Sequence, residues 1–446
     1  MKSRYIVYVA CVILLASSSC RCQDDDIGGP WEIVQGFDIQ EGAVDVDTGV
    51  EPDAADAEDA PDLADIDDVE DTEDIEDTED IREVLDAEPD TPPPNPWEPE
   101  DVPFEHALTD RTEMVIDEDG TFWIAFHSCD RPSCIDAKLS VARRPVGGEW
   151  SIEDIESHTG IFGIDVIEPG RPLVVFPQQR DGSLKAATRI GGRAWEVRRL
   201  PIRRRVTRGS GFDLTQDGQR FYVTYADDGA PEVELFSKAA NTAPGAFVRR
   251  TSLQVPDPQA AMGRGLRADT AGSAYLVHRN DNLGAYGVSR YDFGIDRWPQ
   301  SSYLEDLGDQ FVHSLWITQD FRLCMSGGLD GHLVATCGTT FDLEQSTKRF
   351  TGQRLADRHP SSMIEGDDGT LYIAFNPTGN TELRVAKLPP GGNFQTDWEF
   401  VTVFDGSSFG VSTAIDRFGN LAISFYTCNA RDVCSMKLVL EDPRSL

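Results

Sequence analysis

The 446-residue chain is poor in basic residues, in histidine and in long apolar runs. It has 40 Lys plus Arg against 78 Asp plus Glu and only seven His, so its net charge is −38. Such an acidic chain is a poor partner for nucleic acid, whose phosphates attract basic surfaces. Beyond the N-terminus, no apolar stretch approaches the length that crosses a bilayer. No G-x-S-x-G, H-E-x-x-H or G-x-x-x-x-G-K-[ST] motif occurs either, which removes the common nucleophile, zinc-protease and phosphate-loop signatures.

Residues 1–22, MKSRYIVYVACVILLASSSCRC, have the pattern of an export signal. A short basic start and an apolar run over 5–16 precede three serines, and the run is too short to span a membrane, although a short membrane anchor is the alternative. The ending LASSSC resembles a bacterial lipoprotein signal, with Ser17 where that signal usually has Leu. The resemblance implies a signal peptide over 1–19 and lipid attachment at Cys20 rather than Cys22. We therefore expect a protein lipid-anchored to a bacterial cell envelope, at the outer membrane or cell surface.

Residues 24–96 hold 29 acidic side chains and one basic residue, Arg82, and so carry −28 of the total charge. The stretch VEDTEDIEDTEDI repeats a six-residue unit, and PDTPPPNP closes the segment. High like charge with few apolar residues predicts a disordered, extended linker over 20–96. The alternative is a weak calcium-binding tract at DVDTG (45–49), for which the usual DxDxDG spacing does not recur.

From Trp97 onward a turn followed by an apolar strand recurs seven times. Counted from the residue three before the glycine, or before Phe321 in the fifth unit, the intervals are 50, 48, 54, 49, 48 and 50. Such a period is the signature of a repeat architecture. The seven segments are DEDGTFWIAF (117–126), IEPGRPLVVF (167–176), TQDGQRFYVTY (215–225), DTAGSAYLVH (269–278), TQDFRLCMS (318–326), GDDGTLYIAF (366–375) and DRFGNLAISF (416–425).

Each unit contains four short strand candidates, the fourth opening on an aromatic residue, and almost nothing has helical spacing. Four strands per unit of about 50 residues is β-propeller blade geometry. The seventh unit ends after its third strand, while WEPEDV (97–102) supplies the missing aromatic strand at the other end. We therefore predict an all-β, seven-bladed propeller over 97–446, closed by its N-terminal strand, which leaves no open sheet edge. An open sandwich is the alternative, and it gives no reason for complementary ends.

Over 97–446 the repeated turn and strand resemble those of bacterial surface propellers related to the sialidase and NHL-type families. A true sialidase aspartate box reads S-x-D-x-G-x-T-W, and no repeat here fits it. The resemblance therefore implies a fold and no particular activity.

Six cysteines lie in the predicted propeller, and an even number in an exported protein indicates disulfides. Cys324 and Cys337 are equidistant from the turn dipeptide Asp330-Gly331, which predicts that they face each other across a hairpin. Local loop bridges are the expectation for the other four, with a zinc site uniting them as the alternative. The predicted pairs are Cys129–Cys134, Cys324–Cys337 and Cys428–Cys434.

Candidate ligand residues fall just before the inner strands, where side chains can line the mouth of a central channel. Hydrogen bonding to the backbone between blades is the alternative role for them. Paired carboxylates could serve a glycosidase, but 49 acidic residues in the domain make any single nomination uninformative. The candidates are Arg111, Arg208, Arg264, His313 and His359.

The segment RRLPIRRRVTR (198–208) is a local basic exception in a domain of net charge −13. It could bind an anionic polysaccharide or a lipid headgroup, or the acidic linker of the same chain, or it could be a solvated outer strand. Its arginines are Arg198, Arg199, Arg203, Arg204, Arg205 and Arg208.

These features predict a non-catalytic binding or scaffolding module, since a rigid disc with variable loops suits recognition. We expect a monomer with a glycan or protein ligand, attached to the membrane through its N-terminal lipid, with no cofactor and no metal. The alternatives are a glycan-acting enzyme, either a sialidase-like glycosidase or a lyase, and a subunit of an envelope complex. Three arginines, a tyrosine and two carboxylates gathered in the channel would favour the enzyme.

Overall fold

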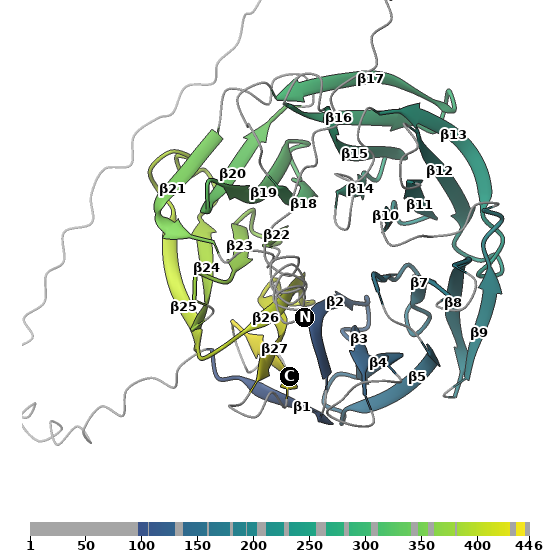
Figure 1. Cartoon of the computed structure of the whole chain (residues 1–446), viewed down its shortest axis with the longest axis horizontal. Coiled ribbons are helices and arrows are strands. Elements are labelled where there is room, and N and C mark those ends of the chain that lie inside the picture. The colour runs from purple at the N-terminus through teal and green to yellow at the C-terminus, as the bar shows by residue number, and fades with distance from the viewer. Residues whose placement is uncertain are drawn as a thin grey trace, which may run out of the picture. The chain divides into compact units, whose positions relative to one another are not determined.

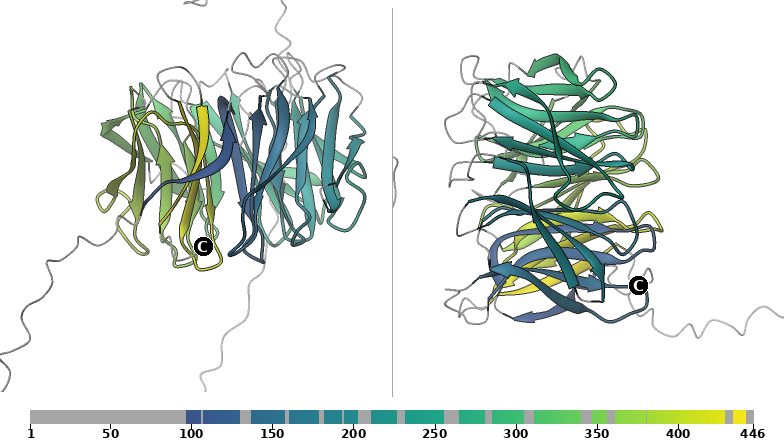
Figure 2. Two further views of the ribbon diagram at one scale, coloured as in Figure 1. Left: turned by 90° about the horizontal axis from the view of Figure 1, so that it is seen from below. Right: turned by 90° about the vertical axis from the view of Figure 1, so that its right-hand side faces the viewer.

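The computed structural model describes residues 97–105, 107–129, 137–157, 160–178, 182–192, 194–202, 211–226, 232–255, 265–280, 285–304, 311–339, 347–355, 361–379, 381–428 and 434–441. Seven four-stranded antiparallel sheets stand in a ring around a central channel, which confirms the predicted seven-bladed β-propeller (Figure 1). Figure 2 shows the strands of each blade side by side across the thickness of the ring. The described residues include no helix, and hence none of sufficient length and apolarity to span a bilayer.

Blades 1 to 4 follow one another along the chain, each with its innermost strand first. Blade 1 contains β2 (Ala107–Ile116), β3 (Phe122–Ser128), β4 (Lys138–Arg144) and β5 (Ser151–Ser157). Blade 2 contains β6 (Gly163–Asp165), β7 (Leu173–Pro177), β8 (Leu184–Gly191) and β9 (Ala194–Arg199). Blade 3 contains β10 (Gly211–Gln216), β11 (Arg220–Ala226), β12 (Glu232–Ala239) and β13 (Val248–Gln254). Blade 4 contains β14 (Leu266–Ala268), β15 (Ser273–Asn280), β16 (Ala285–Asp292) and β17 (Arg297–Leu304).

Blades 5 and 6 repeat this order, and blade 7 takes its outer strand from the N-terminal side of the domain. Blade 5 contains β18 (Phe311–Ile317), β19 (Leu323–Leu329), β20 (His332–Gly338) and β21 (Thr347–Arg354). Blade 6 contains β22 (Ser362–Glu365), β23 (Leu371–Phe375), β24 (Glu382–Leu388) and β25 (Glu399–Asp405). Blade 7 contains β26 (Phe409–Ile415), β27 (Leu421–Cys428), β28 (Cys434–Leu440) and β1 (Glu100–Glu105). Because β1 pairs with β28, with Val102 opposite Met436, the predicted closure by the N-terminal strand is confirmed.

Hydrophobic packing between neighbouring blades holds the ring together. The buried apolar residues form clusters that each join two adjacent blades. Between blades 7 and 1, for example, Val102, Tyr426 and Leu438 pack against Phe122 and Phe126. No blade buries its apolar faces alone, so the ring must form as a unit.

The turns after the inner strands share one hydrogen-bonding pattern in five of the seven blades. The first turn residue donates its N–H to the carbonyl four residues on and accepts from the N–H three residues on, as Asp117 does with Thr121 and Gly120. Blade 3 differs from the prediction, which counted its turn from Thr215. Thr215 lies inside β10, and the turn begins at Asp217, whose N–H bonds to the carbonyl of Arg220.

The carboxylate of Asp117 is a structural group rather than a catalytic one. It is buried, and Oδ1 accepts a hydrogen bond from the Thr121 N–H at 2.9 Å. Oδ2 accepts from Nε1 of Trp123 at 3.0 Å and from the N–H of Gly170, in the turn of the next blade, at 2.9 Å. A buried acid with three donors is well satisfied, so the carboxylate of Asp117 orders its own turn and joins blade 1 to blade 2.

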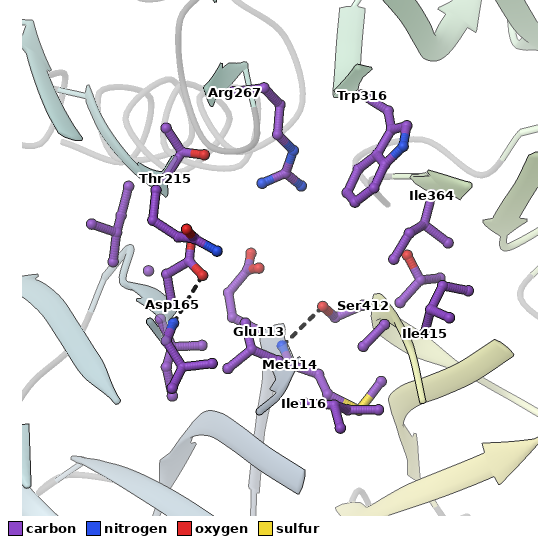
Figure 3. A pocket seen from close by; sticks show the side chains of 18 of the residues that line it. Glu113, Met114, Ile116, Asp165, Thr215, Arg267, Trp316, Ile364, Ser412 and Ile415 are labelled. Carbon is purple, nitrogen blue, oxygen red and sulfur yellow. Dashed lines mark hydrogen bonds between the residues drawn. The ribbon is translucent and has the colours of Figure 1, made fainter. Parts of the chain in front are cut away.

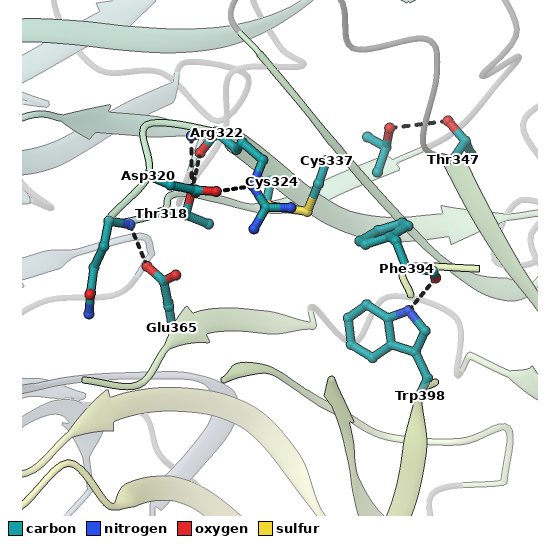
Figure 4. The surroundings of a disulfide bond; sticks show 11 residues. Thr318, Asp320, Arg322, Cys324, Cys337, Thr347, Glu365, Phe394 and Trp398 are labelled. Atoms are coloured by element: carbon teal, nitrogen blue, oxygen red, sulfur yellow. Dashed lines mark hydrogen bonds and ion pairs between the residues drawn. A yellow bond between two sulfur atoms is a disulfide. The ribbon is translucent and has the colours of Figure 1, made fainter. Parts of the chain in front are cut away.

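Two of the predicted disulfides are confirmed as hairpin bridges. Cys324 lies directly opposite Cys337 with a Cα–Cα distance of 4.1 Å (Figure 4), and Cys428 lies opposite Cys434 at 4.0 Å. Cys129 is also disulfide-bonded, and its predicted partner, Cys134, lies outside the described residues. The bonding of Cys428 and Cys434 removes two thiolates from the alternative zinc site.

The hairpin turn between Cys324 and Cys337 is the one predicted from its dipeptide. Asp330 and Gly331 both have positive φ, at 48° and 71°, as the tight two-residue hairpin turn requires. Leu329 faces His332 across the turn, and the pairing continues without a bulge to the two cysteines.

Candidate functional site

The inner strands of all seven blades line a central cavity of about 520 Å³ (Figure 3). That volume lies in the range of small-molecule sites. The residues two positions before the seven turns form one layer of its wall, and all seven line the cavity. They are Val115, Asp165, Thr215, Arg267, Trp316, Ile364 and Ala414.

This layer divides the channel into two sides. Blades 2 to 4 contribute an acid, a hydroxyl and a guanidinium, whereas blades 5 to 7 and blade 1 contribute an indole and aliphatic side chains. In Figure 3 Arg267 and Glu113 point toward the open centre from opposite sides, with Trp316 and Ile364 on the apolar side. A ligand in the channel would therefore meet polar groups on one side and an apolar wall on the other.

Arg111, one of the predicted ligand residues, lies within β2 rather than before it and lines the cavity. Its guanidinium forms an ion pair with Glu113 two residues along the same strand, and both side chains are largely buried. Its backbone carbonyl accepts a hydrogen bond from the hydroxyl of Tyr426, on β27, at 2.9 Å. Arg111 and Glu113 therefore neutralise each other in the wall of the channel.

Arg267, on β14, has a different environment. Its Nε donates to the carbonyl of Leu315 in the next blade at 2.9 Å, and its guanidinium carbon lies 5.1 Å from the ring centroid of Trp316. No carboxylate among the described residues forms an ion pair with it. The Nε1 of Trp316 is buried and likewise has no hydrogen-bond partner in the described part of the chain.

Two acids lie near Arg267 in the channel. The pKa of Asp165 is raised to about 7, mainly by burial and also by the nearby charges of Asp213 and Glu113. A 2.8 Å hydrogen bond from the Val166 N–H and the charge of Arg267 act in the opposite direction. Burial also raises the pKa of Asp213, against the charges of Arg111 and Arg267. The polar side of the channel therefore holds a carboxyl group that gains and loses a proton near neutrality.

Several other polar groups of the channel wall bind the backbone of the next blade. In blades 3, 5, 6 and 7 the side chain four residues before the turn accepts from a backbone N–H in the adjacent blade, as Ser412 does from Met114 at 3.0 Å. Asp213 accepts from the N–H of Leu266 at 2.8 Å in the same manner. The alternative role considered for channel-side polar residues, inter-blade hydrogen bonding, therefore applies to these positions.

The positions of the remaining predicted ligand side chains relative to the cavity stay predictions. Arg208, Arg264 and His359 lie outside the described residues, and His313 lies in β18 at a position whose side chain is not described. The predicted lipidation site, Cys20, also lies outside the described residues.

The predicted basic patch is described only at its start, on outer strand β9. Arg198 and Arg199 are exposed, and Arg198 Nε lies 2.9 Å from Glu196 Oε1. The other members lie outside the described residues: Arg203, Arg204, Arg205 and Arg208.

The sequence analysis did not nominate Glu113, Asp165, Asp213, Arg267 or Trp316. The repeat itself contains the signal that could have found all five. Inner-strand residues two and four before each turn face the channel or the neighbouring blade, so counting back from the turns identifies them. Asp213 lies four before the observed turn at Asp217 and two before the predicted start at Thr215, so either count leads to it.

No cluster of three or more His, Cys, Asp or Glu with metal-binding geometry occurs among the described residues. The acids of the channel are separated by basic and backbone groups that already bind them. The chemistry that the described site offers is therefore hydrogen bonding, charge pairing and proton exchange.

Comparison with known proteins places the chain by fold alone. No protein-family model matches the sequence, and no curated protein is similar to it in sequence. Among solved structures, a sialidase from Streptococcus pneumoniae is 8% identical, with 76% of this chain and 69% of that chain covered and a TM-score of 0.43. The leech intramolecular trans-sialidase is 7% identical, with 77% and 69% covered and a TM-score of 0.45. Hydrazine synthase from Kuenenia stuttgartiensis is 12% identical, with 74% and 95% covered and a TM-score of 0.48.

The structural neighbours thus include sialidase-like propellers, and the chain is a seven-bladed β-propeller of four-stranded blades. At such low identity the likeness concerns the backbone arrangement and carries no activity from those enzymes to this chain.

Proposed function

We propose that this protein is an exported, lipid-anchored binding module that holds a small ligand, such as part of a glycan, in its central channel. The observation that carries the proposal is the cavity of about 520 Å³, with a polar side and an apolar side. Rigid inner strands position both sides, and pre-formed concave sites of this composition are typical of ligand binding.

The composition of the channel favours binding over sialidase-type catalysis. The described lining contains two arginines, and one of them, Arg111, is engaged by Glu113. It contains no tyrosine within the described ranges; buried ones such as Tyr222 and Tyr275 bind turn aspartates instead. The group of three arginines, a tyrosine and two carboxylates expected for that enzyme is therefore not assembled by the described residues.

A glycan-acting enzyme is the second candidate, and one observation favours it. Asp165, with a pKa of about 7, shares the cavity with Glu113, which is ion-paired with Arg111. Two carboxyl groups facing one space, one of them able to give up a proton near neutrality, is the arrangement that glycoside hydrolysis uses.

A channel-blocking variant tests the binding proposal. The full chain is screened against a glycan array and each bound glycan is analysed by mass spectrometry for cleavage products. Ala414 lines the channel beside the hydrophobic cluster between blades 7 and 1, so an indole there should narrow the channel. In an Ala414→Trp protein shown by thermal unfolding to be folded, we expect at least a tenfold loss of binding. The matched control is Val248→Trp on the outer strand β13, where the valine is 55% exposed, and we expect no change.

The outcomes separate the two candidates. Binding that survives in Ala414→Trp would place the ligand elsewhere and refute the channel site. Release of cleavage products by the wild-type chain, lost in Asp165→Asn and in Glu113→Gln, would establish the enzyme instead.

A further inference from the structure

Two arginines line the described part of the channel, and Arg267 is the one whose guanidinium forms no ion pair with a carboxylate of the described residues. Arg111, by contrast, is paired with Glu113 in the same wall. We propose that the channel binds its ligand through an oxyanion, either a carboxylate or a phosphate monoester, held by the two terminal nitrogens of Arg267. This inference rests on the proposed binding function and specifies the ligand class of that site.

The side chain of Arg267 is held in position before any ligand arrives. Its Nε is fixed by the 2.9 Å hydrogen bond to the carbonyl of Leu315, and its plane rests against Trp316. The terminal nitrogens therefore face the lumen, as Figure 3 shows. A planar guanidinium fixed in this way presents two parallel N–H donors, which match the two oxygens of a carboxylate or phosphate.

The neighbouring groups define the rest of the ligand. Trp316 lines the same space with its ring, while its indole nitrogen is buried away from the open centre. Thr215 and Gln216 provide a hydroxyl and an amide on the polar side, and Ile364 provides an apolar surface opposite. A compact hydroxylated ring bearing one anionic group would satisfy all of these contacts.

The charges around Arg267 couple anion binding to a proton. Glu113 on β2 is paired with Arg111 but still raises the pKa of both Asp165 on β6 and Asp213 on β10, the two acids that face Arg267. Three further acids, Asp217, Glu365 and Asp367, lie at the turn end of the cavity. If both facing acids were ionised, they would repel an incoming anion.

If Asp165 keeps its proton, part of this repulsion of the anion is removed. Because burial holds the pKa of Asp165 at about 7, its carboxyl is largely neutral at pH 6 and ionised at pH 8. A bound anion favours the neutral form, and by linkage the neutral form favours the anion. The affinity for an anionic ligand should therefore fall as the pH rises through 7.

Three probes with one sugar scaffold test the anion requirement by calorimetry on the full chain at pH 6. They are glucuronate, glucose 6-phosphate and glucose, which differ in carrying a carboxylate, a phosphate or neither. We expect at least one of the two anionic probes to bind ten times more tightly than glucose. The better anion identifies which oxyanion the site accepts.

Variants at Arg267 test whether its guanidinium holds the anion. Arg267→Gln should lose at least tenfold in affinity for the anionic probe. Arg267→Lys, which keeps the positive charge but not the two parallel N–H donors, should lose less. Arg249→Gln, at an exposed arginine on β13, is the matched control and should bind as the wild type does. Thermal unfolding of each variant distinguishes lost binding from lost folding.

Asp165→Asn tests the proton coupling. The test uses glucuronate, because the second ionisation of a phosphate monoester near pH 6 would change the charge of the other anionic probe. The wild type should lose three- to tenfold in affinity for glucuronate between pH 6 and pH 8, whereas Asp165→Asn should bind it equally at both. Equal pH dependence in the two proteins would refute the coupling.

Failure of the anion proposal can be told apart from failure of the binding function. If glucose bound as tightly as the anionic probes, or Arg267→Gln bound like the wild type, the oxyanion anchor would be wrong although a channel ligand remained. If no glycan or probe bound in a way that Ala414→Trp abolishes, the channel would not be a binding site at all.

Discussion

At the scale of single residues, Phe321 occupies a backbone conformation that the other turns of its kind give to glycine. It has φ of 60° and a side chain that is 60% exposed, so the ring gains little from burial in this position. A left-handed conformation costs a residue with a Cβ about 1 kcal/mol or more. The equivalent positions in blades 1, 4, 6 and 7 are Gly120, Gly272, Gly369 and Gly419.

Relief of this strain is a testable prediction. We expect Phe321→Gly to unfold with a free energy about 1 kcal/mol higher than that of Phe321→Ala, because both lack the exposed ring and only glycine tolerates the positive φ without strain. Urea denaturation of the two variants measures the difference. Equal stability of the two would show that the turn is not strained at this residue.

The carboxyl of Asp165 predicts a pH dependence of stability. Its pKa rises from 3.8 to about 7 on folding, so the protonated form is favoured in the folded state. The stabilisation that follows is complete below about pH 4 and is lost as the pH rises through 7. In Asp165→Asn this dependence disappears, because the amide does not titrate.

Urea denaturation between pH 5 and pH 8 measures this effect. Relative to Asp165→Asn, the wild type should lose about 1 to 3 kcal/mol of unfolding free energy over that interval. Contributions of other titrating groups cancel in the comparison. A constant difference between the two proteins would contradict the raised pKa.

At the scale of elements, β1 joins three blades rather than one. Trp97, just before the strand, is buried in the hydrophobic cluster between blades 6 and 7. Glu100 at its start accepts a hydrogen bond from Nε1 of Trp150 at 2.9 Å and forms an ion pair with Arg144, both in blade 1. The strand that closes blade 7 therefore also fastens the ring on either side of it.

Loss of the Trp97 side chain should consequently destabilise the whole ring. We expect Trp97→Ala to lower the unfolding free energy by about 3 kcal/mol, as large-to-small changes at buried aromatic sites do. Glu98→Ala, at the exposed neighbouring residue, is the control and should change it by less than about 0.5 kcal/mol. A small effect of Trp97→Ala in denaturant would mean that closure depends on the β1–β28 pairing alone.

The elements of the fold were predictable from the sequence because they depend on repeated physics. Turn residues, strand periodicity and the equidistance of Cys324 and Cys337 from a tight turn each predicted a feature that the structure confirms. Apart from Arg111, the lining of the channel was not predicted, because the position two before the turn is occupied by a different side chain in every blade. A repeat search detects what is shared between blades, and a binding site consists of what differs.

At the scale of the whole molecule, the direction of β1 determines where the N-terminal segment joins the ring. Glu100 pairs with Leu438 near the end of β28, so β1 starts at the face that holds the turns after the inner strands. The opposite face, where the inner strands begin, is therefore the one turned away from the point of attachment.

The predicted lipid at Cys20 can be tested by the distribution of the protein between membrane and soluble fractions. If the lipid attaches the chain to a membrane, Cys20→Ser should move the protein from the membrane fraction to the soluble fraction on ultracentrifugation of lysed cells. Cys22→Ser is the matched control, since it changes a neighbouring cysteine and should leave the protein with the membrane.

The channel itself should not depend on the anchor. Because the described ring closes through β1 and its own blades, Cys20→Ser should retain the anion affinity and the pH dependence expected of the wild type. Recovery of Cys20→Ser in the membrane fraction would show that attachment is not through this cysteine. Loss of ligand binding in the released protein would instead show that the membrane, and not the propeller alone, completes the site.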